Sequence, residues 1–409
     1  MSASPLKRVV YVVSLFPCWS ETFIVREINA LLENGVDVRI VSLKAPSEAL
    51  VQSDAQALLP RVRHPRSLLH ALSGACQALL HAPAATLSTL GQVIAGHWRS
   101  PAVLGKSLGA WLRGLEHYPW LKRFSPQIIH AHWATYPSTA AWALGKVLDL
   151  PFSFTCHAHD IFTERQLIAR KIHDAALAVT ISRFNVDWLS ERETGAARDK
   201  LKVIHCGVDL DANTWQSEDR ASNTILAVGR LDPIKGFATL IRALGLLKQA
   251  GQPFHCRLLG SGPLENELRQ LSSSLGLDQQ IEFSGAQPQA VVRQWMNEAA
   301  LFVLPSEVAA DGNRDGIPVA LMEAMATGCP VISTRVSGIP ELIDDQHDGL
   351  LVEPAQPQAL ADAMQRLLTD TTLRARVTRG ARDRIERDFD ARREARKLQD
   401  NMEAILDEC

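Results

Sequence analysis

Short apolar runs rich in β-branched residues alternate with amphipathic segments along most of this chain. The runs predict buried strands, and the segments, with apolar positions three and four residues apart, predict helices. The predicted strands cover residues 9–14, 37–43, 127–132, 152–156, 176–181, 202–205, 224–228, 254–259, 281–284, 300–304 and 331–333. The predicted helices cover residues 22–34, 138–148, 237–249, 263–275, a short segment from 318, and most of 357–408. Such alternation is typical of parallel sheets covered by helices on both faces.

The strands form two series, which predicts an α/β fold with two facing doubly wound, Rossmann-like domains. A length of 409 residues is also too great for one ordinary core. The expected N-terminal domain covers residues 1–208 and the C-terminal domain covers 209–390, while the charged helical segment 391–409 has no accompanying strand. Because ligands of open parallel sheets bind beyond the carboxyl ends of the strands, the two domains are expected to share one cleft.

The composition of the chain bears on its partners and its compartment. A net charge of -2 gives no reason to expect nucleic acid as a partner. The seven cysteines are scattered, odd in number and without metal-ligand spacing, which favours a reducing cytoplasm. The sequence shows no signal-peptide pattern and no apolar run long enough to span a membrane. We therefore expect a cytoplasmic globular protein.

One region departs from the overall charge balance. Between residues 55 and 148 the only acidic residue is Glu116, whereas Arg and Lys occur throughout, with Trp98, Trp111 and Trp120 among them. A basic, Trp-containing helical region, from Arg61 to Arg123, is typical of a peripheral surface for an anionic membrane, here the inner face of the cytoplasmic membrane. The alternative is a pair of ordinary packing helices with a solvated face, and the sequence leaves both open.

The segment 315–334 combines a loop, a short helix and a buried strand. Pro318 suits the first helical turn and Gly328 suits the residue just past the helix end, so Asp315 falls in the loop and Glu323 on the helix. A loop that leads into a helix N-terminus is a natural anion site. A carboxylate beside such a site binds hydroxyls rather than the anion. Phosphate and hydroxyls together indicate a nucleotide sugar.

Two further loops follow predicted strands of the second series. Gly229 allows a ligand to approach the backbone, Arg230 offers a planar fork for phosphate oxygens, and Lys235 adds a second cation. These two cations could neutralise a diphosphate without a metal, although a surface turn with solvated cations fits the same residues. Gly260 and Gly262 form a glycine-rich turn that alone is a weak signal.

In the first series, His157, His159 and Asp160 follow a strand, and His130 and His132 end the preceding one. A histidine at a strand end can bond a sugar hydroxyl or handle a proton. The same residues invite a metal interpretation, but their spacing does not match known metal sites, so we expect no metal.

The turn between the first strand and the first helix contains Ser20, Glu21 and Thr22, with Ser20 as the predicted N-cap. This turn is expected at the cleft mouth, on the side of the acceptor.

Together these motifs resemble the family-4 retaining glycosyltransferases of GT-B fold. The resemblance covers nearly the whole chain and is strongest in residues 228–236, 259–263 and 315–354. The family pattern has two Glu residues with seven residues between them, and this sequence has Asp315 in place of the first. The opening Ser-Glu-Thr-Phe-Ile, with Arg26 and Glu27, is similar to the branch that builds bacterial exopolysaccharides such as colanic acid. The Gly-Gly turn common in the family's first loop is absent.

The resemblance implies a metal-independent glycosyltransferase that needs no cofactor besides its nucleotide-diphosphate sugar donor. Arg230 and Lys235 would hold the diphosphate, Glu323 the ribose hydroxyls and Asp315 the donor sugar, with His157 near the reacting carbon. The last helix would return to the first domain. The acceptor would be a glycan or a polyprenyl-diphosphate-linked glycan.

The remaining predicted site residues complete the two sides of the cleft. The donor side adds Gly229, Gly260, Gly262, Gly316, Ile317 and Pro318, and the acceptor side comprises Ser20, Glu21, Thr22, His159 and Asp160. Two alternatives remain open: a nucleotide-sugar epimerase, which would need no acceptor, and a catalytically silent sugar-nucleotide-binding subunit, which the shorter Asp315 favours. The donor sugar, its base, the linkage and the oligomeric state do not follow from the sequence.

Overall fold

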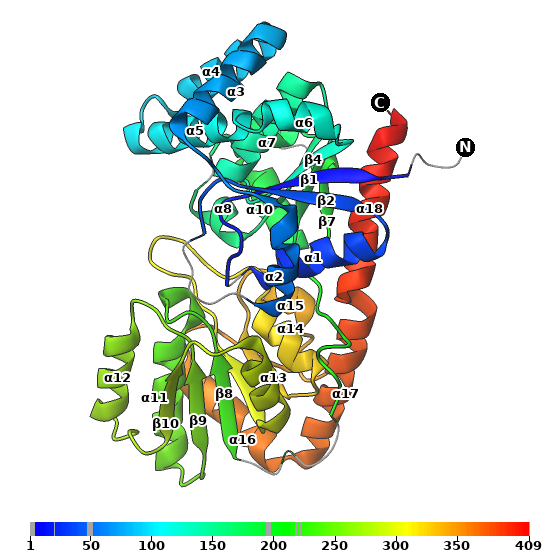
Figure 1. Cartoon of the computed structure of the whole chain (residues 1–409). Helices are drawn as coiled ribbons and strands as arrows, with labels where there is room; N and C mark the ends of the chain where they lie inside the picture. Colours follow the sequence, from blue (N-terminus) through cyan, green and yellow to red (C-terminus); the bar gives the residue numbers. More distant parts are fainter. Residues whose placement is uncertain are drawn as a thin grey trace. The chain divides into compact units, whose positions relative to one another are not determined.

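A computed structural model of the chain describes residues 5–19, 21–46, 52–164, 166–193, 198–216, 220 and 223–408 (Figure 1). The chain divides into two compact units. The first comprises Met1–His205 with Arg392–Cys409, and the second comprises Cys206–Ala391. Each unit has its own parallel sheet and its own hydrophobic core.

In the described part of the first unit, seven parallel strands have the order β3-β2-β1-β4-β5-β6-β7. They are β1 (Arg8–Val13), β2 (Asp37–Ser42), β3 (Val62–Arg63), β4 (Ile128–His132), β5 (Phe152–Cys156), β6 (Leu177–Thr180) and β7 (Leu201–Val203). Because successive side chains point to opposite faces, Val9, Tyr11 and Val13 of β1 join one core and Val10 and Val12 join another. Both faces of this sheet therefore require helices.

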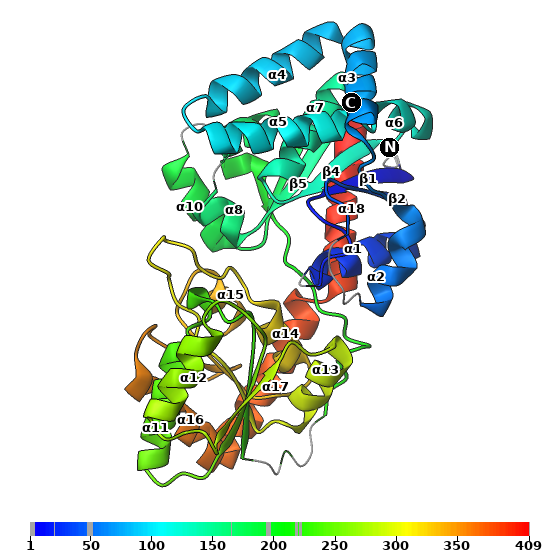
Figure 2. The ribbon, with the colours of Figure 1, turned by 60° about the vertical axis from the view of Figure 1, so that its left-hand side comes forward.

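Helices cover both faces of the first sheet. They are α1 (Thr22–Glu33), α2 (Ser53–Leu58), α3 (Leu68–His81), α4 (Pro83–His97), α5 (Pro101–Leu115), α6 (Tyr118–Phe124), α7 (Tyr136–Leu148), α8 (Ala158–Phe162), α9 (Ile168–Asp174), α10 (Arg183–Arg192) and α18 (Ala391–Glu408), with the short 3-10 helices η1 (Leu59–Arg61) and η2 (Arg198–Lys200). Helices α1, α2 and α18 share a core with Tyr11, and α3 to α7 share a core with Val10 on the opposite face (Figure 2).

Helix α18 packs on the first unit although it follows the whole second unit in sequence (Figures 1 and 2). Its Met402 is fully buried in the core that contains Tyr11. Its Glu403 accepts a hydrogen bond of 3.1 Å from the N–H of Leu6, and its Gln399 accepts one of 2.9 Å from the side-chain amide of Asn34. The first unit is thus built from two separate stretches of chain.

The described part of the second unit holds six parallel strands in the order β10-β9-β8-β11-β12-β13. They are β8 (Thr224–Val228), β9 (His255–Leu259), β10 (Ile281–Gly285), β11 (Leu301–Leu304), β12 (Val331–Thr334) and β13 (Leu350–Val352). The helices are η3 (Pro233–Lys235), α11 (Phe237–Gln249), α12 (Glu265–Ser274), α13 (Gln289–Glu298), α14 (Val319–Ala326), α15 (Ile339–Leu342), α16 (Pro357–Thr369) and α17 (Thr371–Asp388). One continuous core joins this sheet to its helices.

The predicted fold class is confirmed, because each unit has the strand order of a doubly wound Rossmann-like sheet. The sequence missed β3 and β13, which have two and three residues and are too short to produce a periodic pattern. Pro318 is the N-cap of α14 instead of lying in its first turn, while Gly328, with φ of 78°, follows the helix end as predicted. Among the described helices, none has both the length and the apolarity needed to cross a membrane.

Candidate active site

Both sheets reverse their strand order at one point, and polar residues gather there in each unit. In the first unit the reversal lies between β1 and β4, and in the second between β8 and β11. In open α/β sheets the connections on the two sides of such a point run in opposite directions, which leaves a crevice beyond the strand ends. A binding site is therefore expected among the residues that follow β1, β4, β8 and β11.

A row of three hydrogen-bonded side chains lies at the reversal in the first unit. His132 ends β4, His157 follows β5, and Glu27 comes from α1, the helix that follows β1. Glu27 Oε1 lies 3.0 Å from Nε2 of His132, and Nδ1 of His132 lies 3.1 Å from Nε2 of His157. Tyr11 adds a hydrogen bond of 2.6 Å from its hydroxyl to Glu27 Oε1. The row connects three elements that are distant in sequence.

The protonation of this row follows from its burial and partners. Burial opposes ionisation of Glu27, but the charge and hydrogen bond of His132, with the Tyr11 hydroxyl, outweigh it and lower the pKa of Glu27. Burial, reinforced by the neighbouring histidines, holds the pKa of His157 well below its usual value, so this ring is neutral. An ionised Glu27 only accepts hydrogen bonds, so His132 donates from Nε2. When His132 is neutral, its Nδ1 accepts, and His157 must carry its proton on Nε2.

Aromatic side chains fix the position of His157. Its ring centroid lies 4.8 Å from that of Phe23 and 4.6 Å from that of Trp133. Trp133 has φ of 77°, a backbone conformation that costs energy for a bulky residue and that clusters at functional sites. Its indole N–H donates to Glu21 Oε1 over 2.9 Å, so Glu21 is engaged inside the unit.

Asp160 and Lys171 hold the loop after β4 from two sides. The carboxylate of Asp160 accepts from the backbone N–H groups of His157, at 2.7 Å, and of Ala134. Lys171 Nζ donates to the carbonyls of Ala134 and Thr135, each over 2.7 Å. Both side chains are fully buried, and burial raises the pKa of Asp160 to about 7 and lowers that of Lys171 to about 7. Asp160 was predicted on the acceptor side, and in the structure its carboxylate holds the backbone N–H groups of Ala134 and His157.

The other predicted residues of the first unit have different environments. His159 is exposed and Thr22 is half-buried at the start of α1. The N-cap of α1 is Glu21, while Ser20, predicted for that role and for the acceptor side, lies outside the described residues. His130 is fully buried between the hydroxyls of Ser153 and Thr155, and burial lowers its pKa to about 3.

One group in the described chain brings metal-ligand atoms together. Those of Glu27, His130 and His132 all lie within 4.8 Å of one another. However, each of the four imidazole nitrogens already has a hydrogen-bond partner of its own. The chemistry of this group therefore fits a hydrogen-bonded network better than a set of free ligands.

In the second unit, the loops after β8 and β9 pack directly on each other. Gly229 donates to the carbonyl of Leu259 over 3.0 Å, and Leu231 donates to that of Ser261 over 3.0 Å. Gly260 has φ of 134°, and a Cβ on it would lie 1.9 Å from the carbonyl oxygen of Gly229. Glycine is thus required there for the approach of the loops, in addition to any contact with a ligand. Gly262 is required in the same way, because its Cβ would lie 2.4 Å from the oxygen of Leu231.

Lys235 and Asp315, which are 80 residues apart, form an ion pair in the second unit. Nζ of Lys235 lies 2.7 Å from Asp315 Oδ1, and Ser306, just after β11, donates its hydroxyl to Asp315 Oδ2 over 2.7 Å. The side chains of Lys235 and Asp315 are 17% and 10% exposed, so the pair is shielded but accessible. Its position beside the β8 and β11 ends places a cation and a fixed carboxylate at the reversal.

A close backbone contact holds this loop against the end of β11. Gly236 has φ of 65°, and a Cβ on it would lie 1.9 Å from the carbonyl oxygen of Pro305. Glu307 supports the same contact: its N–H donates to the carbonyl of Ile234 over 2.9 Å, and its carboxylate accepts from the Thr239 hydroxyl over 2.5 Å.

The remaining predicted donor-side residues differ in exposure. Glu323 lies in α14 and is 4% exposed. Gly316, Ile317 and Pro318 are buried in the loop that leads into this helix. Arg230 has a side chain that is 72% exposed and lies 3.9 Å from Asp232, so its guanidinium remains open to solvent.

Sequence reasoning gave no role to several residues that the structure brings into these groups: Tyr11, Glu27, Ser306 and Glu307. Glu27 had one signal, its place in the Arg-Glu pair after the first turn. The others are single polar residues within or just after strands, and only the parallel pairing of the strands brings them together.

Comparison with known proteins decides the family. The family model Glycosyltransferase Family 4 matches residues 20–212, and the model Glycosyl transferases group 1 matches residues 213–384. WcaL of Escherichia coli, a glycosyltransferase proposed to act in colanic acid biosynthesis, is 30% identical over 416 residues, covering 97% of this chain and 100% of that protein. The chain belongs to the family-4 glycosyltransferases.

This glycosyltransferase is also similar to a second relative and to solved structures. The amylovoran biosynthesis glycosyltransferase AmsK of Erwinia amylovora is 36% identical over 213 residues, about half of each chain. Among solved structures, HepE of Anabaena in complex with UDP has a TM-score of 0.71 at 17% identity, covering 98% of this chain and 100% of that one. Sucrose-phosphate synthase of Thermosynechococcus elongatus has a TM-score of 0.73 at 18% identity over the same shares. These likenesses confirm the fold of the glycosyltransferase as GT-B.

Proposed function

We propose that this glycosyltransferase moves a sugar from a nucleotide-diphosphate sugar to a glycan or polyprenyl-diphosphate-linked acceptor, in the synthesis of an exopolysaccharide. The names of WcaL and AmsK support the pathway class, and the solved complexes of HepE with UDP and with UDP-glucose support the donor class. The observation that carries the proposal is the Lys235–Asp315 pair at the strand reversal of the second unit.

The proposed chemistry needs charge compensation at the leaving diphosphate. Lys235, held by Asp315, and the solvent-exposed Arg230 supply two cations on one loop, and a fixed cation stabilises the charge that develops as the sugar leaves. With these cations the reaction is proposed to need no metal and no further cofactor. Glu323 is proposed to bind the ribose hydroxyls and Asp315 a hydroxyl of the donor sugar.

His157 is proposed to contact the donor sugar near the reacting carbon. Its fixed orientation supports this role, because Phe23, Trp133 and His132 hold the ring in one place. We propose that the sugar is transferred with retention, with the acceptor hydroxyl attacking from the face that the diphosphate leaves. The acceptor carrier is proposed to reside at the inner face of the cytoplasmic membrane, with the protein in peripheral contact.

The test begins with a screen of nucleotide sugars for thermal stabilisation, since a bound donor raises the melting temperature by mass action. The donor found is then used with Lys235→Ala. We expect turnover to fall by about 100-fold or more, because one preorganised charge at a transition state is worth roughly this factor. Lys248→Ala, an exposed lysine of the same unit, is the control and should keep wild-type turnover. Normal turnover of folded Lys235→Ala would refute the proposal.

The same experiment separates the alternatives. Incubation of the protein with donor alone, followed by analysis of the sugar, would reveal an epimerase. Donor binding without either transfer or isomerisation, across a panel of lipid-linked and soluble glycans, would instead indicate a silent binding subunit.

A further inference from the structure

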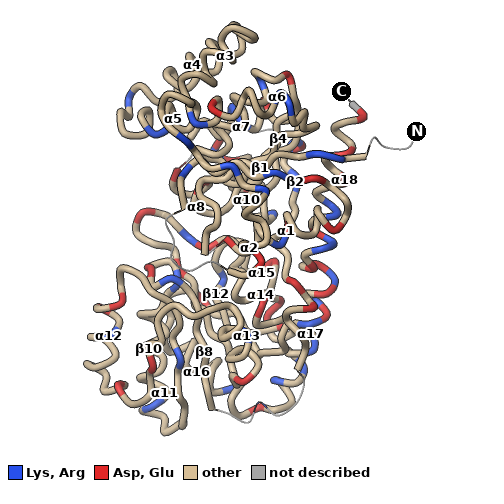
Figure 3. The backbone as a smooth tube through the Cα atoms, in the orientation of Figure 1, with Lys and Arg blue, Asp and Glu red and all other residues tan. Residues whose placement is uncertain are grey.

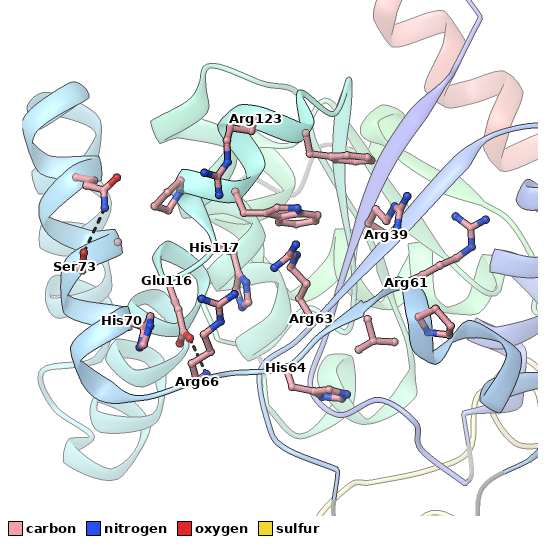
Figure 4. Close-up of a pocket in the computed structure, with 17 residues that line it drawn as sticks. Arg39, Arg61, Arg63, His64, Arg66, His70, Ser73, Glu116, His117 and Arg123 are labelled. Carbon is pink, nitrogen blue, oxygen red and sulfur yellow. Dashed lines mark hydrogen bonds between the residues drawn. The ribbon is translucent and has the colours of Figure 1, made fainter.

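A cavity of about 680 Å³ opens between the β2–β3 edge of the first sheet and helices α3 and α6 (Figure 4). Five arginines line it: Arg39, Arg61, Arg63, Arg66 and Arg123. Arg39 has the same orientation as Val41 on β2, so the cavity lies on the sheet face opposite Glu27 and Tyr11. It is therefore separate from the row of Glu27, His132 and His157.

Most of the positive charge in this cavity is not neutralised by the protein. Asp37 pairs with Arg39 and Arg61, and Glu116 accepts from the backbone of Arg66 and pairs with Arg113. Within the described chain, the guanidinium groups of Arg63, Arg66 and Arg123 have no carboxylate partner. Burial, with the charges of Arg66, Arg123 and Arg39, lowers the pKa of Arg63. Like charges held this close together favour an anion between them.

The lining also contains flat apolar surfaces beside the charges. The guanidinium of Arg63 lies 4.5 Å above the ring of Trp120, which stacks on Phe124 at 5.4 Å. Phe124 also lies beneath Arg39 at 5.7 Å. These rings keep the arginines extended and oriented without neutralising them, so the charge stays available to a ligand.

Next to the cavity lies a pair of helices without any charged residue. Residues 67–98 contain no Asp, Glu, Lys or Arg, and they form α3 and α4 (Figure 3). Arginines flank this stretch at both ends, Arg66 before it and Arg99 after it. A contiguous exposed apolar surface marks a site of contact with a membrane or another protein.

Large apolar side chains of these helices are exposed to solvent. The exposed fractions are 77% for Leu69, 80% for Leu80 and 61% for Trp98, and Leu68, Leu72, Leu79, Leu87 and Ile94 are exposed as well. On α3, Leu69 and Leu80 lie opposite Ala71, which faces the core, and next to the side that carries His70 and Gln77 into the cavity lining. The apolar surface and the basic cavity are thus neighbours on one helix.

We propose that the arginine cavity binds the phosphate head group of an anionic membrane lipid while the exposed leucines of α3 and α4 lie among the lipid chains. This proposal rests on the proposed membrane location and gives it a binding site. Charge complementarity is the argument for this ligand. A bilayer surface has phosphate anions next to an apolar layer, and the protein has a basic cavity next to exposed leucines.

The test measures co-sedimentation with vesicles of phosphatidylglycerol and phosphatidylcholine, and with vesicles of phosphatidylcholine alone. The first variant carries Arg63→Gln, Arg66→Gln and Arg123→Gln, and the second carries Leu69→Gln and Leu80→Gln. The control removes three exposed arginines of the second unit, with Arg242→Gln, Arg376→Gln and Arg379→Gln, and so matches the charge change. Thermal melting checks that each variant is folded.

The wild type and the control are expected to bind the anionic vesicles. The arginine variant should bind about tenfold or more weakly at low salt, with the difference shrinking as salt is added, because each basic residue near an anionic surface contributes electrostatic attraction that salt screens. The leucine variant should bind more weakly at every salt concentration, because the apolar contribution is not screened. Arg123→Gln alone, at an exposed position, should show a smaller loss and covers the case in which the triple variant is unstable.

Three outcomes would overturn the proposal. One is equal vesicle binding by the arginine variant and the control. The second is stabilisation by free inorganic diphosphate that depends on the three arginines while vesicle binding does not, which would assign the cavity to a soluble anion. The third is that the wild type is a dimer in solution and does not bind vesicles, while the leucine variant is a monomer. Nucleotide-sugar stabilisation, measured on the same variants, reports on the second unit and shows whether a failure concerns the lipid site or sugar transfer.

Discussion

The two strand reversals hold polar groups in opposite ways. In the first unit, His132 and His157 are buried and linked in a hydrogen-bonded row, and burial keeps His157 neutral. In the second unit, Lys235 is paired with Asp315 and remains partly accessible. Burial fixes the orientation of a side chain and favours its uncharged form. An ion pair holds a charged side chain in place with a smaller desolvation penalty than an unpaired buried charge would have. The difference indicates that the first unit contributes geometry to the proposed reaction and the second contributes charge.

The largest expected effect that tests this comparison is that of His157→Ala. If His157 positions the donor sugar, its removal should lower turnover by about 100-fold or more, in the range of a well-placed polar group at a reacting centre. Steady-state kinetics with the donor found by thermal screening measure the effect. His173→Ala, at an exposed histidine of the same unit, is the control and should change turnover little. Equal losses in both variants would argue against a specific role for His157.

Acid should destabilise the first unit more than the second. His130 keeps a pKa of about 3 when folded, against an ordinary value of 6.5, so below pH 6.5 the unfolded chain binds a proton that the folded chain does not. The contribution of neutral His130 to the free energy of unfolding is therefore fully present above pH 6.5 and decreases as pH falls. At pH 5 it has decreased by about 2 kcal/mol. His117, with a pKa of about 4, and His157 act in the same direction, and Asp160, with a raised pKa, acts against them.

Hydrogen exchange followed separately in peptides of each unit, at pH 7 and pH 5 with correction for the intrinsic rates, measures this difference. The first unit should lose protection at pH 5 while the second keeps it. A His130→Gln variant, which cannot titrate at this position, should show a smaller change between the two pH values. Equal acid sensitivity in the two units would contradict the explanation that the buried, neutral histidines make the first unit sensitive to acid.

Glu27→Gln tests whether the row is organised by its carboxylate. Glutamine keeps a carbonyl oxygen that can accept from His132 and Tyr11 as Glu27 Oε1 does, but it removes the negative charge. We expect turnover about tenfold lower because the charge-assisted hydrogen bond is lost, with the His157 proton still on Nε2 in nitrogen-15 NMR of labelled histidine. Glu33→Gln, an exposed position at the end of α1, is the matched control. A His157 proton moved to Nδ1 would show instead that the glutamine amide donates to His132, and that the charge of Glu27 sets the direction of the row.

The smallest effect is expected from Ser306→Ala. Its hydroxyl donates to Asp315, and loss of one hydrogen bond to a charged group should weaken donor binding about fivefold by letting the carboxylate turn. Titration of the donor into the wild type and the variant measures this. Ser274→Ala, at an exposed helix position, controls for the loss of a hydroxyl. If donor affinity does not change, Lys235 alone is sufficient to orient Asp315.

The sequence predicted the strands and helices better than it predicted which side chains contact each other. The apolar runs predicted both sheets, because strands buried on both faces produce continuous hydrophobic segments. Lys235 and Asp315 were identified one at a time by their loops, but their pairing depends on the approach of Gly236 to Pro305, which no local pattern contains. The contact of Glu27 with His132 could not be predicted for the same reason, since 105 residues of sequence separate the two.

The part played by α18 has a consequence for the order in which the chain acquires structure during synthesis. The second unit, Cys206–Ala391, is one continuous stretch, whereas the first needs residues on both sides of it. A ribosome therefore delivers every residue of the second unit before it has delivered Met402, which fills the core beneath Tyr11. The apolar surface that α18 covers stays open while the second unit forms, so the nascent N-terminal half is expected to require protection by chaperones until the final helix emerges.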